Sequence, residues 1–415
     1  MNFRFSIFDF RLMTHAIARP ALARGACGRS TIENRKSKIP QRGSVLIIVM
    51  ITLIFTAFAL IAFIDKASND LLVESRVAEG KRLRTEAYSA LEATLAVLED
   101  FRQVGGGLHS PAEGWADPLA FAGWSPTEGR TVTVSFEDES GKLSLPRIQT
   151  PTLVRLFETW EMQTPEAEKL ADALMGWMKA DHIYTTTISP DYERAQLPYL
   201  PPARPLRSYR ELAVIDVARE TFFTETGQPN ALWHRFTENI SLFEFRQPNL
   251  NGAKSDVLTA LGQFDETQRG KITEYLGGGG PFAANGQSWF TDTGAARTIA
   301  GEAGNPGAFG TTISALRILI TVQQGLAQFR LSAVVAPVQG GASTVQKTAT
   351  DSRNQAAAAA SQAAGGPPAP SGNRTASTNP NAASNAKKLN YPFTLLEIRE
   401  NDEIAPPPPP PPAPI

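Results

Sequence analysis

Cysteine is almost absent from this chain, which has a single one, Cys27, in 415 residues. A chain with one cysteine can form no internal disulfide and offers no thiolate cluster for zinc or an iron–sulfur centre. A large net charge is also missing, because 40 Lys and Arg nearly balance 41 Asp and Glu. The composition therefore gives no general attraction to nucleic acid or to an anionic membrane surface, and we expect no nucleic-acid partner.

The common catalytic and metal-binding motifs are missing as well. The four histidines (His15, His109, His182 and His234) are scattered, and none has a second histidine at metal-ligand spacing. No Gly-Lys pair is followed by Ser or Thr, and no Gly-x-Ser-x-Gly elbow occurs. We therefore expect no enzyme, although a catalytic triad of residues distant in the sequence stays open.

One apolar run stands out, from Val45 to Ile64. Its twenty residues contain no charge, glycine or proline. At ~1.5 Å per residue such a helix crosses a bilayer core of ~30 Å, and soluble helices are rarely apolar on every face over this length. Residues 1–43 carry nine Lys or Arg against two acidic residues. The sequence therefore predicts a single-pass helix with a cytoplasmic N-terminus. The chain after Ile64 is expected on the other side of the membrane, outside the cytoplasm.

The helical pattern continues beyond the apolar run. From Ser44 to Val104 there is no proline and only one glycine, Gly80. Apolar residues then recur at three- and four-residue steps, as in Leu83, Ala87, Leu91, Leu95 and Leu98. The pattern predicts one long helix whose second half is amphipathic and packs against a globular head.

The junction Gly43-Ser44 resembles the leader of type IV pilins and pseudopilins. The resemblance implies that a prepilin peptidase cleaves between Gly43 and Ser44, with methylation of the new N-terminus, whether translation starts at Met1 or Met13. Two positions depart from the family: Ser44 replaces the commoner Phe or Met, and Ile48 replaces the usual Glu. The missing Glu resembles the tip-forming minor pseudopilin of type II secretion, which has no neighbour above it to neutralise a carboxylate.

Further blocks resemble the same family, the type II secretion system minor pseudopilin K or general secretion pathway protein K. In chain order they are EDESGKLSL (137–145), EAEKLADALMGW (166–177), the helical segment Tyr209–Ile215 and PNLNGAKSDVLTAL (248–261). The resemblance implies an α+β fold, in which a long N-terminal pilin helix packs on an antiparallel sheet with an all-α insertion domain.

Composition and pattern together predict the domain organisation. The segments are a basic leader (1–43), the pilin helix (44–104), a loop and first strand (105–147), a helical insertion (148–276), a Gly-rich loop (277–310), head strands (311–338), a disordered linker (339–388), a last strand (389–402) and a polyproline tail (403–415). The expected strands are Thr131–Phe136, Thr312–Thr321, Gln328–Val338 and Phe393–Arg399. Ser140-Gly141 is expected to form a turn and Thr164 to cap a helix.

Calcium is the one cofactor that the resemblance raises. Family members bind it through acids after an Asp-Trp pair and in the following loop. Where the family shows Asp-Trp-x-Asp-x-Asp this chain has GWMKAD (176–181), so two of the three acids are missing. Asp181, Asp191 and Glu193 remain as calcium ligands, although solvated loop acids are the simpler interpretation.

The resemblance implies a minor pseudopilin that helps initiate and cap the periplasmic pseudopilus. Its expected partners are other minor pseudopilins, the major pseudopilin, the prepilin peptidase and the inner membrane. The alternatives are a minor pilin of a type IV pilus or competence apparatus, a membrane-anchored periplasmic enzyme, and a DNA-binding helical module, which the lack of a Lys/Arg stripe in 151–261 disfavours.

Overall fold

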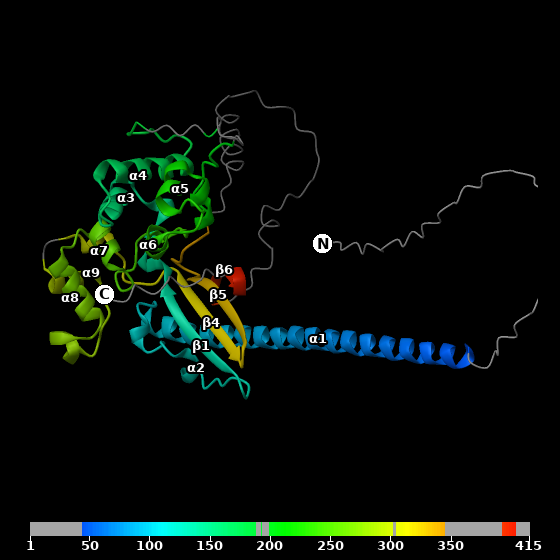
Figure 1. Ribbon diagram of the computed structural model, residues 1–415. Helices are drawn as coiled ribbons and strands as arrows, with labels where there is room; N and C mark the ends of the chain where they lie inside the picture. The colour runs from blue at the N-terminus through cyan, green and yellow to red at the C-terminus, as the bar shows by residue number, and fades with distance from the viewer. Residues whose placement is uncertain (1–43, 188–191, 193–198, 302–303, 345–391, 404–415) are drawn as a thin grey trace, which may run out of the picture. The chain divides into compact units, whose positions relative to one another are not determined.

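The computed structural model describes residues 44–187, 192, 199–301, 304–344 and 392–403 (Figure 1). The predicted leader, nearly all of the predicted linker and the polyproline tail lie outside these residues. The chain divides into two compact units, Met1–Leu71 and Leu72–Ile415. Helix α1 (Ser44–Gly105) belongs to both, and it contains every described residue of the first unit.

The second unit contains an antiparallel sheet with the strand order β1-β4-β5-β6 (Figure 1). Its strands are β1 (Thr131–Asp138), β4 (Leu316–Gln324), β5 (Ala327–Pro337) and β6 (Phe393–Glu400). Alternate residues of β4 are buried, as the pleat of a half-buried strand requires. These side chains share one core with the apolar face of α1, which includes Leu83, Ala87, Leu91, Leu95 and Leu98. The α+β class, with a long helix packed on an antiparallel sheet, is thereby confirmed.

A helical region is inserted in the chain between β1 and β4, which are neighbours in the sheet. Its helices are α3 (Thr150–Glu158), α4 (Thr164–Met178), α5 (Asp216–Phe222), α6 (Ala231–Asn239), α7 (Ser255–Gly262), α8 (Glu266–Leu276) and α9 (Thr293–Ala300). They have their own core, separate from that of the sheet, around Leu153, Phe157, Phe222 and Phe236. The insertion also holds a short strand, β3 (Ile240–Ser241), which pairs in parallel with β2 (Leu143–Ser144).

Short helical turns complete the described segments. They are α2 (Pro118–Phe121) and the 3-10 turns η1 (Pro111–Glu113), η2 (Glu139–Gly141), η3 (Leu145–Arg147), η5 (Tyr209–Val214), η6 (Gly280–Asn285), η7 (Pro306–Ala308) and η9 (Asn401–Glu403). The segment 209–215, expected to be a helix, is thus mostly a 3-10 turn.

The prediction of a loop over residues 277–310 is wrong for its middle part. Helix α9 lies there, and Ala296 and Ala300 are buried in the core of the helical region. The Asp292 side chain starts the helix by accepting from the backbone N–H groups of Gly294 and Ala295. The glycines on both sides of this capped, alanine-rich helix led the sequence analysis to predict a loop.

Two local predictions also need correction. Thr164 is not the cap of α4, because the cap position belongs to Gln163 and the Thr164 hydroxyl donates to Glu158 instead. The strand expected from Thr312 begins only at Leu316, since the preceding residues bond elsewhere. Ile313 N donates to Leu108 O, and Ser314 N donates to Ser140 Oγ.

Candidate functional site

The first part of α1 presents apolar side chains on every face. The large apolar side chains from Val45 to Ile64 are 49–74% exposed, so no protein core covers them. Thr52 and Thr56 donate their hydroxyls to the carbonyls of Val49 and Leu53, so these polar groups are paired inside the helix. An 18-residue window here has a mean hydropathy of 3.0, and α1 is the one helix among the described residues that is long and apolar enough to cross a membrane. Its length and composition are compatible with a single-pass anchor.

The predicted cleavage site lies at the edge of the described chain. Ser44 is the first residue of α1, and Gly43 lies outside the described residues. Cleavage between them stays a prediction. Position 48, where pilins usually have a glutamate, is an isoleucine in this chain, so α1 carries no carboxylate there. The Ile48 side chain is 60% exposed.

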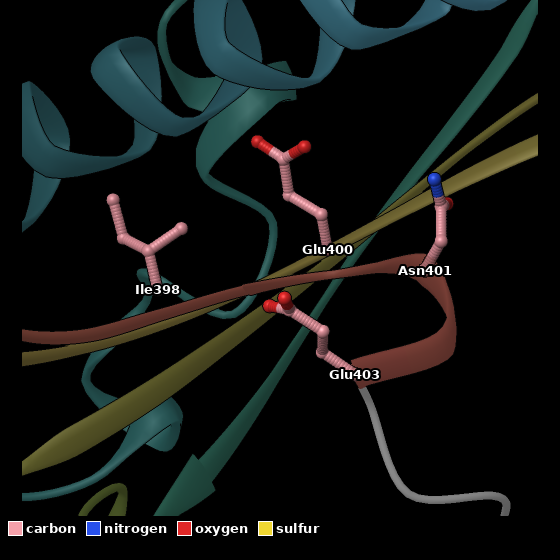
Figure 2. Close-up of a pocket in the computed structure, with 4 residues that line it drawn as sticks. All are labelled: Ile398, Glu400, Asn401 and Glu403. Carbon is pink, nitrogen blue, oxygen red and sulfur yellow. The ribbon is translucent and has the colours of Figure 1, made fainter. Parts of the chain in front are cut away.

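Polar contacts fix the second half of α1 against the head. Arg84 Nε donates to Glu400 Oε1 at 2.9 Å, and the Tyr88 hydroxyl donates to the same atom at 2.6 Å. Figure 2 shows Glu400 and Asn401 pointing to the same side of β6, and with Ile398 and Glu403 they line an open pocket at the end of that strand. The Arg84 guanidinium and the Tyr88 hydroxyl lower the pKa of Glu400. Glu400 is therefore a structural contact to α1 rather than a free ligand of the pocket.

Where β1 ends, a half-buried carboxylate joins the sheet to the helical region. Asp138 Oδ1 accepts from Ser140 N (2.9 Å) and Ser140 Oγ (2.6 Å), and Oδ2 accepts from Asn249 Nδ2 (2.7 Å). Asn249 Nδ2 also donates to the carbonyl of His109. Burial raises the pKa of Asp138 to about 6, against donors that favour its charged form. Asn249 thus connects the Asp138 carboxylate at the end of β1 to the segment around His109.

The next residue, Glu139, forms a buried ion network. Its side chain is 1% exposed and accepts from Arg317 Nε of β4 at 2.7 Å. Lys142 Nζ lies 3.3 Å from Glu139 Oε2 and donates to the carbonyl of Thr237 in α6 at 3.1 Å. Burial opposes ionisation of Glu139, but the charges of Lys142 and Arg317 outweigh it and lower its pKa to about 2. The network joins the sheet to the helical region at their boundary.

The glycine beside this network lies in the turn that the sequence predicts, which is η2, and it also allows close packing. A Cβ on Gly141 would collide with the backbone carbonyl of Gly252, and a Cβ on Gly252 would collide with the Asp138 carboxylate. Gly141 has no positive φ. A glycine is therefore needed here because there is no room for a side chain, not because of the backbone conformation. The blocks 137–145 and 248–261, predicted as separate family motifs, therefore meet in space.

The proposed calcium ligands are not brought together by the described structure. Asp181 is exposed, while Asp191 and Glu193 lie outside the described residues. Among the described residues no group of three His, Cys, Asp or Glu side chains could hold a metal ion. Calcium binding by Asp181, Asp191 and Glu193 stays a prediction.

A buried acid of the same region was missed by sequence reasoning. Asp172, in the middle of α4, is fully buried and bonds to His182, Thr185 and Thr186 of the following loop. In the sequence it appears only as the Asp of LADAL, and nothing local distinguishes it from a surface acid.

Comparison with known proteins identifies the inserted region. Residues 138–225 match the protein family described as "Type II secretion system (T2SS), protein K". This match begins at Asp138 and includes η2, α3 and α4, so the Asp138–Glu139 junction marks its start. No curated protein matches the sequence.

A solved structure is also similar. It is a chain in the crystal structure of the GspK-GspI-GspJ complex from the enterotoxigenic Escherichia coli type 2 secretion system. The two chains are 14% identical, with a TM-score of 0.44, and the match covers 66% of this chain and 97% of that one.

The family match covers residues 138–225 alone. It confirms the predicted resemblance where the quoted blocks 137–145, 166–177 and 209–215 lie. At residues 138–225 this chain therefore carries a domain of the type II secretion system protein K family.

Proposed function

We propose that this chain is a minor pseudopilin of a type II secretion system and helps to initiate and cap the tip of the periplasmic pseudopilus for protein export. One observation carries the proposal: a protein K domain is inserted between β1 and β4 of a head in which a long helix packs on an antiparallel sheet. Export of the secreted substrate is then a result of assembly, and this chain contributes no catalysis.

The proposed topology follows from charge and hydropathy. The apolar part of α1 anchors the chain in the inner membrane, residues 1–43 with their excess of Lys and Arg stay cytoplasmic, and the head is periplasmic. A prepilin peptidase removes the leader after Gly43. Other minor pseudopilins and the major pseudopilin are the assembly partners.

The apolar Ile48 supports a place at the tip. A carboxylate inside a bilayer is costly unless it is paired. A subunit with no neighbour above it would have no partner for such a carboxylate. This chain accordingly has no Asp or Glu between Ser44 and Ile64.

Photocrosslinking in the membrane tests the proposal. A photoreactive residue replaces Leu72, which is 58% exposed on α1 beyond the apolar run, and the full chain is expressed with the complete secretion apparatus. We expect adducts with pilin-like subunits, identified by mass spectrometry, that vanish in a strain lacking the other minor pseudopilins. Adducts that contain no pilin-like subunit would contradict an assembly role.

A further inference from the structure

The loop after α4 folds back onto the helix through one buried side chain. Asp172 Oδ2 accepts from Thr185 N (2.9 Å), Thr185 Oγ1 (3.0 Å) and Thr186 N (2.7 Å). Its other oxygen, Oδ1, lies 3.1 Å from His182 Nε2. Because a carboxylate only accepts, His182 is the donor and its proton is on Nε2.

These donors satisfy the carboxylate within the protein. An ionised carboxyl group has about four acceptor positions, and Asp172 receives four contacts while fully buried. Burial alone would raise the pKa of Asp172, but the donors from Thr186 and Thr185 lower it. Hydrogen-bond donors of the protein thus stabilise the negative charge of Asp172, as a bound cation would otherwise do.

A second, independent observation concerns position 176. The family resemblance places an Asp directly before Trp177, at the start of the pattern Asp-Trp-x-Asp-x-Asp, where this chain has Gly176. The Tyr184 hydroxyl occupies the space next to Gly176. A Cβ atom on residue 176 would already collide with Tyr184 Oη. Tyr184 also packs edge-on against His182, with ring centroids 5.1 Å apart. The loop therefore fills with protein atoms the space that a carboxylate at position 176 would need.

We propose that this chain folds the loop at residues 179–187 with hydrogen bonds to Asp172 in place of a divalent cation. Asp172 acts as the anion that the loop encloses, and His182, Thr185 and Thr186 act as its ligands. Asp181 is exposed and takes no part. The inference rests on the family assignment of residues 138–225, and it does not depend on a place at the pseudopilus tip.

Hydrogen–deuterium exchange of the full chain in detergent micelles tests this directly. Amide exchange in peptides covering 179–187 is compared in EDTA and in millimolar CaCl2. We expect the same protection in both, within twofold, because the Thr185 and Thr186 amides bond to Asp172 in either buffer. Protection that rises tenfold or more with calcium would overturn the proposal.

Two matched variants separate the acids of this region. Asp172→Ala leaves the Thr185 and Thr186 amides without their acceptor, and we expect their exchange to become at least tenfold faster in either buffer. Asp181→Asn, at an exposed acid of the same loop, should leave exchange unchanged. A calcium-dependent loss of protection in Asp181→Asn would instead assign the loop to a cation site.

A milder substitution keeps the proposal testable if Asp172→Ala does not fold. His182→Ala removes one of the four contacts, and we expect exchange in 179–187 to increase about threefold while peptides from β4 and β5 keep their protection. Unchanged exchange in this variant would contradict the role of His182. Loss of crosslinking to pilin-like subunits, with this exchange pattern intact, would contradict the assembly role alone.

Discussion

Arg317→Ala should destabilise the second unit by about 3 kcal/mol, the lower end of the usual cost of breaking a buried ion pair, because Lys142 remains beside Glu139. Arg317 bonds the 1%-exposed Glu139 and also reaches Ser332 and Glu397, so its removal affects three strands at once. Denaturant unfolding followed by tryptophan fluorescence measures this, because all six tryptophans lie between Trp115 and Trp289, outside α1.

The control is Arg399→Ala, whose side chain is 32% exposed and pairs with Glu397. A partly exposed pair of this kind contributes about 1 kcal/mol or less. An effect of Arg317→Ala no larger than that of Arg399→Ala would contradict the account of the network.

The pH dependence gives a second check on the same variant. The pKa of Glu139 is about 2 in the folded protein, below the ordinary value of 4.5 for a glutamate. A lowered carboxylate pKa contributes stability that is present above the unfolded value and is lost as the pH falls through the folded one. We therefore expect the difference between wild type and Arg317→Ala to be full at pH 7 and to narrow below about pH 4.5. A difference that widens in acid would contradict this assignment.

Gly141→Ala should destabilise the second unit by about 3 kcal/mol, at the upper end of overpacking costs. The new methyl group would meet the carbonyl of Gly252, which is backbone and cannot rotate away. The junction between the sheet and the helical region would have to open, so the same tryptophan-detected unfolding measures the effect.

Gly270→Ala is the matched control for this substitution. Gly270 lies inside α8, and a Cβ there meets nothing within 4 Å. Alanine should stabilise such a helix position by about 0.5–1 kcal/mol. Equal and small effects of the two variants would show that the junction tolerates the added methyl group.

Much of the fold could be predicted from periodicity. The absence of proline from 44 to 104 predicts α1, and the alternating strand segments place all four strands of the main sheet to within a few residues. Local pattern fails where context decides. Helix α9 is surrounded by glycines, and β4 begins late because Ser314 bonds to Ser140, 174 residues away in sequence.

The candidate site was less predictable, for a physical reason. Asp138 and Glu139 look like ordinary acids in the sequence, and only the fold brings Asn249 to the first and Arg317 to the second. Asp172 likewise shows no signal until its loop folds back. Gly141 was correctly expected in a turn, since it ends η2, but the sequence alone does not reveal that Gly252 packs against it.

The central claim is that this chain is a processed, prepilin-type subunit carrying a protein K domain. Mass spectrometry of its N-terminus, after expression with and without a prepilin peptidase, tests it most directly, with Gly43→Leu as the uncleavable control. The account predicts a mature chain that starts at Ser44 only when the peptidase is present and Gly43 is intact. An uncut N-terminus, or cleavage on the far side of Ile64, would contradict it.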